Sequence, residues 1–294
     1  MLIDRDGASV RVRAPAKLNL FLEVLGRRPD GYHELATLMV GVGLYDTLEV
    51  REGPPGAVRL RCDHPGLPAG PDNLVVRAAE VLRKEAGAHA GLDVVLRKRI
   101  PLAAGLAGGS SDAAGTLAGL NRLWRLGLSR ADLARHGAGL GSDVAFFFYG
   151  PAAWCTGRGE RVEPLRLGAP LHFVLACPPA GLTTATVFAA LQVPDLPTDG
   201  AGVRRAAAAG DVEALGGQLF NRLQPVAEGL CPAVRALHGR LAGPGPAGQL
   251  MSGSGTTVYA LCRDAGEALR VARAVRPARE GGDATRVCVV RSCD

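Results

Sequence analysis

Lysine and aromatic residues are scarce in this sequence. Its 34 basic residues include only three lysines, Lys17, Lys84 and Lys98, and Phe, Trp and Tyr together make up 4% of the chain. The arginines are dispersed and no nucleic-acid motif accompanies them, so a net charge of +6 and a pI near 9.2 do not predict a nucleic-acid partner. A surface that favours phosphorylated small molecules explains the same charge.

Signals for a membrane span, for export and for zinc are also missing. No apolar run reaches about 18 residues, and residues 1–12 alternate between polar and apolar types. The seven cysteines form no C-x-x-C pair and no H-E-x-x-H occurs, so we expect free thiols and no metal ligands. With 47% hydrophobic residues, the chain is expected to be a globular cytoplasmic protein without a membrane partner.

The two common nucleotide-binding loops do not fit the most glycine-rich candidate stretch. A Walker A loop needs lysine, and no lysine follows Lys98; the glycines of Pro101–Ala114 do not spell G-x-G-x-x-G. The stretch reads P-L-A-A-G-L-A-G-G-S-S-D-A-A. It follows an alternating apolar run over 92–100 and precedes a helix-period run over 111–126, which predicts a strand, a loop and a helix.

A glycine-rich loop at the start of a helix has the features needed to bind an anion. The first N–H groups of a helix have no intrahelical partner, and they carry the positive end of the helix dipole. Gly105, Gly108 and Gly109 let the backbone approach an anion, while Ser110 and Ser111 add hydroxyl donors. We therefore expect a phosphate here, and a plain turn is the alternative.

Residues 16–24 alternate as a strand does. The pattern places Lys17 and Asn19 side by side on one face, with leucines on the other. In a chain with so few lysines, Lys17 marks a place for a compact point charge. The alternative is an edge strand with a solvated polar face.

Three further stretches carry candidate chemistry. Tyr32 and His33 follow a Pro-Asp-Gly turn and offer a stacking face and a hydrogen-bonding edge for a nucleobase, although ordinary packing explains the pair as well. Asp143 directly precedes an apolar segment, so it is either a catalytic carboxylate or a turn aspartate. The small residues of Met251–Thr256 let the backbone approach a ligand or the phosphate loop, or make a tight turn.

The order of elements predicts an α+β fold in two domains. Strands are expected over 35–50 and 57–62, and a helix capped by Asp72 or Asn73 runs to residue 86. After a domain change near 157–170, strands are expected over 171–177, 256–262 and 286–290, with helices over 186–241 and 264–275. We therefore divide the chain into residues 1–162 and 163–294.

Several of these segments resemble one family. The pattern Pro-x-x-x-Gly-Leu-x-Gly-Gly-Ser-Ser-x-Ala-Ala is similar to the ATP loop of the galactokinase, homoserine kinase, mevalonate kinase and phosphomevalonate kinase (GHMP) superfamily. More particular segments resemble the 4-diphosphocytidyl-2-C-methyl-D-erythritol kinases of the non-mevalonate isoprenoid route. They are 14–20 with 30–34, 141–143, 220–225 and 250–255.

The resemblance implies a fold, a reaction and a set of residues. The fold is that of GHMP kinases, with an N-terminal mixed sheet and a C-terminal ferredoxin-like α+β sandwich. The reaction is ATP- and Mg²⁺-dependent phosphorylation of the substrate C2 hydroxyl, with Asp143 as base and Lys17 as the cation beside it. The residues that the resemblance implies bind ATP are Pro101, Leu102, Ala103, Ala104, Gly105, Leu106, Ala107, Gly108, Gly109, Ser110 and Ser111. The residues that it implies bind the substrate are Asn19, Tyr32, His33, Thr184 and Phe188.

Departures from the family pattern are few. Ala104 and Ala107 stand where glycine is frequent, and Thr184 lacks the usual proline-flanked context. Two other functions stay open: a GHMP kinase for homoserine, mevalonate or a sugar, and a nucleotide-binding protein without catalysis. Tyr32 and His33 argue against the first, and the presence of both Lys17 and Asp143 argues against the second, because binding alone requires no base. We expect a monomer or weak homodimer.

Overall fold

The computed structural model describes residues 1–87, 91–276 and 284–294, which form two compact units. The first unit comprises Met1–Ala16, Leu44–Ile100 and Ala107–Gly150. The second comprises Lys17–Gly43, Pro101–Leu106 and Pro151–Asp294. The units interleave in sequence because β2 (Ser9–Arg27), β3 (His33–Gly53) and the loop after residue 100 pass from one to the other. A sequential division at residues 162 and 163 stays a prediction.

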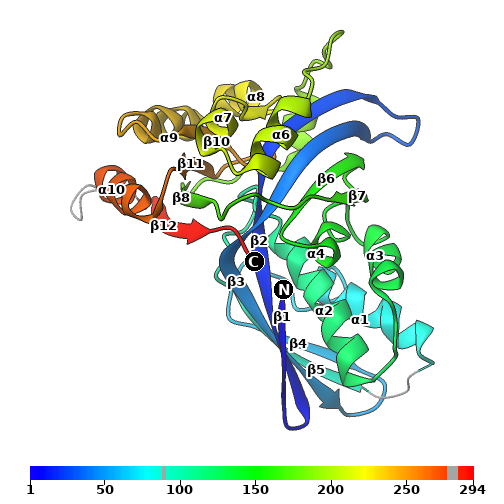
Figure 1. Ribbon diagram of the computed structural model, residues 1–294. Coiled ribbons are helices and arrows are strands. Elements are labelled where there is room, and N and C mark those ends of the chain that lie inside the picture. The colour runs from blue at the N-terminus through cyan, green and yellow to red at the C-terminus, as the bar shows by residue number, and fades with distance from the viewer. Residues whose placement is uncertain (88–90, 277–283) are drawn as a thin grey trace. The chain divides into compact units, whose positions relative to one another are not determined.

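The first unit combines a mixed sheet with helices (Figure 1). Strand β1 (Leu2–Asp6) lies antiparallel to the start of β2, and β5 (Gly91–Arg97) lies antiparallel to the end of β3 and parallel to β4 (Val58–Cys62). The helices are α1 (Leu74–Glu85), α2 (Gly108–Leu123), α3 (Arg130–Ala138) and α4 (Phe146–Tyr149). The expected cap of α1 is Asn73, which accepts from Val75 N, and at the start of α3 Ser129 forms a capping box with Asp132.

Small residues bring α2 close to the sheet. A Cβ built on Gly115 would lie 3.0 Å from Leu48 Cδ1, and one on Gly119 would lie 3.1 Å from Val12 Cγ2. The close approach buries most of the helix, which begins at Gly108, three residues before the start that the apolar periodicity indicates. The whole glycine-serine segment therefore belongs to the first turn of α2.

The second unit contains a four-stranded antiparallel sheet in the order β10-β11-β8-β12. Its strands are β8 (His172–Cys177), β10 (Gly248–Met251), β11 (Val258–Cys262) and β12 (Arg286–Arg291). Beside β2 and β3 lie β6 (Ala152–Gly157), β7 (Arg161–Pro164) and β9 (Phe220–Asn221). The helices are α5 (Thr184–Ala189), α6 (Ala201–Ala209), α7 (Val212–Gly216), α8 (Gln224–Leu230), α9 (Pro232–Ala242) and α10 (Ala265–Val275).

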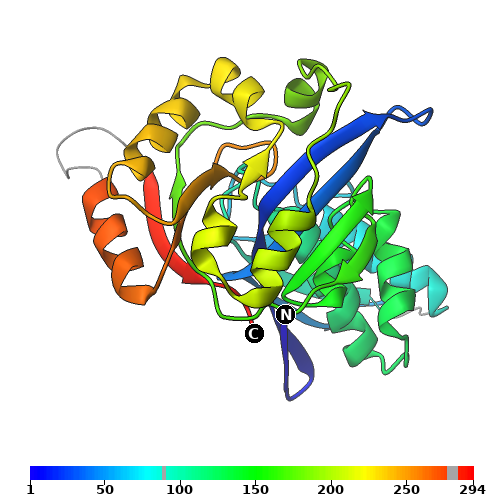
Figure 2. The same cartoon turned by 45° about the horizontal axis from the view of Figure 1, so that its top comes forward.

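Helices cover one face of this sheet. Alternate residues of β8 and β11, such as Val174 and Ala260, pack with Leu237 of α9 and Val271 of α10 in one buried cluster. Figure 2 shows α9 and α10 together along the sheet. The arrangement confirms the expected α+β sandwich, whose strands carry residues apolar on both faces. No helix of the described residues combines the length and apolar character needed to cross a membrane.

The polar face of residues 16–24 is buried, so the alternative of a solvated edge strand is wrong. Lys17 is 4% exposed, and Glu23 is fully buried. The Glu23 carboxylate accepts hydrogen bonds from Val24 N at 2.8 Å, Thr198 N at 2.7 Å and the Arg222 guanidinium at 2.7 and 2.9 Å. A buried carboxylate with this many donors anchors β2 to the residues around 198 and 222.

Arg222→Met is expected to lower the free energy of unfolding by about 3 kcal/mol at pH 7, because Glu23 is left buried without its counter-ion. Burial alone would raise the pKa of Glu23, but hydrogen bonds from Arg222, Thr198 and Val24 lower it below the ordinary 4.5. The stabilisation is therefore present above that value and is lost as pH falls through the lowered pKa. Urea denaturation at pH 7 and in acid measures both effects.

The matched control is Arg291→Met, which removes an exposed arginine that pairs with Asp294 and is expected to cost less than about 1 kcal/mol. Equal losses in the two variants at pH 7 would contradict the role given to Glu23.

Candidate active site

Residues 101–106 are held against the segment between β10 and β11. Ser252 Oγ donates to Gly105 O at 2.9 Å, and Thr257 N donates to Ala104 O at 3.2 Å. Gly105 has a φ of 75°, and a Cβ there would lie 2.0 Å from Ser252 O. Met251–Thr256 both approaches the glycine loop and makes a turn between the antiparallel strands β10 and β11, so two of the interpretations open for it are observed together.

The loop then enters α2 through a left-handed residue. Ala107 is the N-cap of α2 with φ 53°, and no side chain caps the helix. Gly108 is buried and Gly109 exposed, so the first turn presents backbone N–H groups without a Cβ in the way. The Ser111 hydroxyl is already engaged, because it donates to Pro15 O at 2.6 Å. Ser110 is half-buried and carries the hydroxyl nearer to solvent.

Two alanines of the loop adopt a backbone conformation that favours glycine. Ala103 has a φ of 48° and Ala107 a φ of 53°. A non-glycine residue in the left-handed region costs about 1 kcal/mol or more, so the loop stores strain at both positions. Of the two alanines that stand where the family pattern often has glycine, Ala107 has a positive φ and Ala104 does not.

Lys17 and Asn19 project from the same face of β2, as the alternation predicts. Lys17 Nζ donates to Asn19 Oδ1 at 2.6 Å and to Gly105 O at 3.1 Å. Asn19 Nδ2 in turn donates to Thr37 Oγ1 at 2.8 Å, and Asn19 N donates to Ser252 Oγ at 3.3 Å. The Lys17 ammonium is therefore fixed at the backbone of the glycine loop.

His33 and Phe188 are brought together, with Thr184 on the same helix as Phe188. The His33 and Phe188 rings lie 4.8 Å apart, and Thr184 Oγ1 is 3.0 Å from Ser254 Oγ. Within the described residues, His33 Nε2 is buried and has no hydrogen-bond partner. Burial, and then the charge of Arg27, lower the pKa of His33, so the ring is neutral at pH 7.

Tyr32 points a partly solvated ring outward beside a cation. Its side chain is 52% exposed, and the Arg158 guanidinium carbon lies 4.6 Å from the ring centroid. Because the ring is exposed, a flat ligand can stack on it without another side chain having to move away first.

Asp143 lies in the turn between α3 and α4, in the first unit. The turn adjoins the start of α2, since a Cβ on Gly141 would lie 3.6 Å from Ser110 Oγ. Asp143 itself is half-buried. Lys17 belongs to the second unit, so each unit carries one of the two expected catalytic groups.

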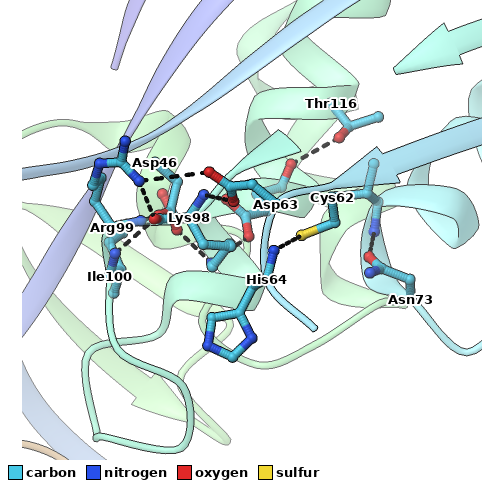
Figure 3. Close-up of polar contacts among 12 residues, drawn as sticks. Asp46, Cys62, Asp63, His64, Asn73, Lys98, Arg99, Ile100 and Thr116 are labelled. Carbon is cyan, nitrogen blue, oxygen red and sulfur yellow. Dashed lines mark hydrogen bonds and ion pairs between the residues drawn. The ribbon is translucent and has the colours of Figure 1, made fainter. Parts of the chain in front are cut away.

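Sequence reasoning missed a buried charged cluster in the first unit (Figure 3). Lys98 Nζ donates to Asp46 Oδ2 and, at 2.7 Å, to Asp112 Oδ2. All three side chains are buried. The available signal was the scarcity of lysine, because Lys98 stands at the end of β5 immediately before the glycine loop. No group of three or more His, Cys, Asp or Glu side chains that could hold a metal ion occurs in the ranges that the structure describes.

Comparisons with known proteins agree along the whole chain. The GHMP kinases N terminal domain matches residues 73–151, and the GHMP kinases C terminal domain matches residues 203–279. The 4-diphosphocytidyl-2-C-methyl-D-erythritol kinase of Pelotomaculum thermopropionicum is 44% identical over 90% of this chain and 92% of its own length. The enzyme of the same name from Exiguobacterium sibiricum is 41% identical over 96% of this chain and 98% of its own.

Solved structures give the same result. A crystal structure of 4-(cytidine 5'-diphospho)-2C-methyl-D-erythritol kinase is 35% identical and superimposes with a TM-score of 0.80, covering 97% of this chain and 100% of that one. A homoserine kinase from Cytophaga hutchinsonii has a TM-score of 0.76 at 19% identity, covering 100% of this chain and 97% of that one. The second likeness shows a shared fold.

Gly105→Ala is expected to destabilise the protein by at least about 2 kcal/mol more than Gly127→Ala. Both glycines have a positive φ, of 75° and 69°, but a Cβ at Gly127 meets nothing within 4 Å, whereas one at Gly105 collides with Ser252 O. The control variant Gly127→Ala is therefore destabilised by the backbone strain alone, which costs about 1 kcal/mol. Urea denaturation of both variants measures the difference, and equal losses would show that the loop does not depend on this close approach.

Proposed function

The chain belongs to the 4-diphosphocytidyl-2-C-methyl-D-erythritol kinases within the GHMP kinases, and we propose that it performs their reaction. It transfers the γ-phosphoryl group of ATP to the C2 hydroxyl of 4-diphosphocytidyl-2-C-methyl-D-erythritol, giving the 2-phosphate and ADP. This is the kinase step of the methylerythritol phosphate route to isopentenyl diphosphate. The enzyme acts in the cytoplasm as a monomer or weak homodimer.

The observation that carries the proposal is the uncapped start of α2. Its N–H groups have no side-chain cap, and the exposed Gly109 puts no side chain at the positive end of the helix dipole. ATP phosphates are held there by residues 101–111, with the Ser110 hydroxyl as an added donor. Mg²⁺ bound to the ATP phosphates would supply charge neutralisation for the transferring group.

Asp143 serves as the general base. Its turn adjoins Ser110 within the first unit, which supports a place beside the bound phosphates. The C2 hydroxyl is tertiary and a weak nucleophile, so an aligned carboxylate that accepts its proton contributes directly to the rate. Lys17, fixed by Asn19 and Gly105, is the proposed catalytic cation and attracts the transferring phosphoryl group.

The cytidine end of the substrate is read by the second unit. The unpaired Nε2 of neutral His33 hydrogen-bonds an edge of the cytosine, and Phe188 supports the ring from behind. Tyr32 stacks against the cytidine, while Asn19 and Thr184 contribute polar contacts. A base-reading site of this kind separates this substrate from mevalonate, homoserine and galactose, which carry no base.

The purified protein is expected to release ADP with ATP, Mg²⁺ and diphosphocytidyl-methylerythritol, and not with mevalonate, homoserine or galactose. Asp143→Asn should lower kcat by about 10²-fold or more, because the base is lost while the geometry is kept. A coupled ADP assay measures turnover, and binding of a non-hydrolysable ATP analogue shows that the variant is folded.

Asp4→Asn is the matched control, since Asp4 is exposed on β1 and should leave turnover unchanged. Turnover with a different alcohol would discard the assignment of Tyr32 and His33. Analogue binding without turnover on any of the four alcohols would favour a nucleotide-binding protein without catalysis.

His33→Phe is expected to raise KM for the cytidine substrate about tenfold while kcat changes little, because the ring contact with Phe188 is kept and a hydrogen bond is lost. His238→Phe, which replaces a half-buried histidine of α9, is the control. Since the pKa of His33 is lowered, the wild-type KM should stay flat above pH 6.5. An unchanged KM in His33→Phe would remove His33 from the base-binding role.

A further inference from the structure

One lysine and two carboxylates lie buried beneath the first turn of α2 (Figure 3). Lys98 is 6% exposed, Asp46 0% and Asp112 2%. A Cβ built on Gly108 would lie 3.2 Å from Lys98 Nζ, so the ammonium is packed against the backbone of the turn itself. Asp112 stands one turn further along the same helix. The cluster therefore links the end of β5, strand β3 and the start of α2 within the first unit.

The two carboxylates are not equivalent. Asp46 Oδ1 accepts from Arg99 N at 2.5 Å and Ile100 N at 2.9 Å, and Asp46 Oδ2 accepts from Lys98. Asp112 Oδ2 accepts from Lys98 at 2.7 Å, but Asp112 Oδ1 is buried and has no partner among the residues described. A single ammonium cannot neutralise two carboxylates, so the excess negative charge falls on Asp112.

Burial raises the pKa of Asp112 to about 7; the Lys98 charge opposes the rise and the Asp46 charge adds to it. Glu80 pairs with Arg83 on α1 and Asp132 with Arg135 on α3. Asp63, whose Oδ1 accepts from Lys98 N at 2.8 Å, pairs with Arg99. The protonation of Asp112 is therefore governed by Lys98, by Asp46 and by any further charge placed at the start of α2.

Given the ATP site proposed above, the anion that arrives at this turn is a polyphosphate. Its charge acts on Asp112 through a buried, weakly screened environment, where like charges repel strongly. Burial alone would lower the pKa of Lys98, but the charges and hydrogen bonds of Asp112 and Asp46 raise it above the ordinary 10.5, so Lys98 does not respond by releasing its proton. A proton on Asp112 is the change that removes the repulsion and also supplies a hydroxyl donor.

We propose that Lys98 and Asp46 position the first turn of α2 for the nucleotide, and that the Asp112 carboxylate takes up a proton from solvent when the ATP phosphates bind. The new O–H bond forms at a carboxylate oxygen, and a buffer acid or hydronium ion loses the proton. The Lys98–Asp46 pair then stays as a neutral unit beneath the bound phosphates. Asp112 is a positioning residue in this scheme, since it acts through the helix and not on the reacting atoms.

The test is calorimetric titration of the protein with a non-hydrolysable ATP analogue at pH 7, in buffers of different ionisation enthalpy. Wild type should take up close to half a proton more than Asp112→Asn, because an acid with a pKa of about 7 is half ionised there. Analogue affinity should also weaken by up to about tenfold between pH 6 and pH 8 in wild type relative to Asp112→Asn. Asp93→Asn, at a carboxylate of β5 that pairs with Arg51, should match wild type.

Equal proton uptake by wild type and Asp112→Asn would overturn the proposal. If Asp112→Asn fails to fold, difference infrared spectroscopy of wild type decides the question: binding of the analogue should produce the carbonyl band of a protonated carboxyl group, and its absence would overturn the proposal. A wild-type protein that does not bind the analogue at all would contradict the ATP site itself. Binding without proton uptake contradicts the inference about Asp112 alone.

Discussion

A buried ammonium group must be paired, and this constraint shapes the backbone around the glycine loop in both units. In the second unit Lys17 donates to Asn19 and to the carbonyl of Gly105. In the first unit Lys98 donates to two carboxylates and packs against Gly108. Moving a hydrogen-bond partner away from a buried charge costs much free energy. Each lysine therefore fixes the segment of the loop next to it.

The loop itself is held in a conformation that its sequence does not favour. Ala103 and Ala107 have positive φ values, and Gly105 approaches Ser252 O more closely than any side chain permits. The strain is balanced by backbone hydrogen bonds from Lys17 and Thr257 to the loop carbonyls. The N–H groups at the start of α2 are uncapped because the N-cap residue is Ala107, whose side chain has no hydrogen-bond acceptor. The uncapped helix start, on which the proposed ATP site rests, is therefore a consequence of how the loop is fixed.

Local patterns in the sequence were enough to predict most elements. The strand ending at Arg97, the helix capped by Asn73 and the sandwich of the C-terminal half appear where periodicity and capping residues indicate them. The start of α2 was placed too late, because small residues such as Gly108 give no apolar signal. The polar face of β2 was left open between solvent and interior, since alternation says which residues share a face and not what covers it.

The sequence by itself determined the family, the reaction and the residue types at the loop. The reason is that several motifs in a fixed order along the chain identify a reaction, which composition alone does not. Only the tertiary structure decided that Lys17 and Asn19 are buried together, that Ser252 supports Gly105, and that Lys98 joins Asp46 across 52 residues of sequence. The reason is physical. A local pattern is set by neighbours along the chain, whereas the burial and pairing of a charge depend on segments that meet only when the sheet and helices have formed.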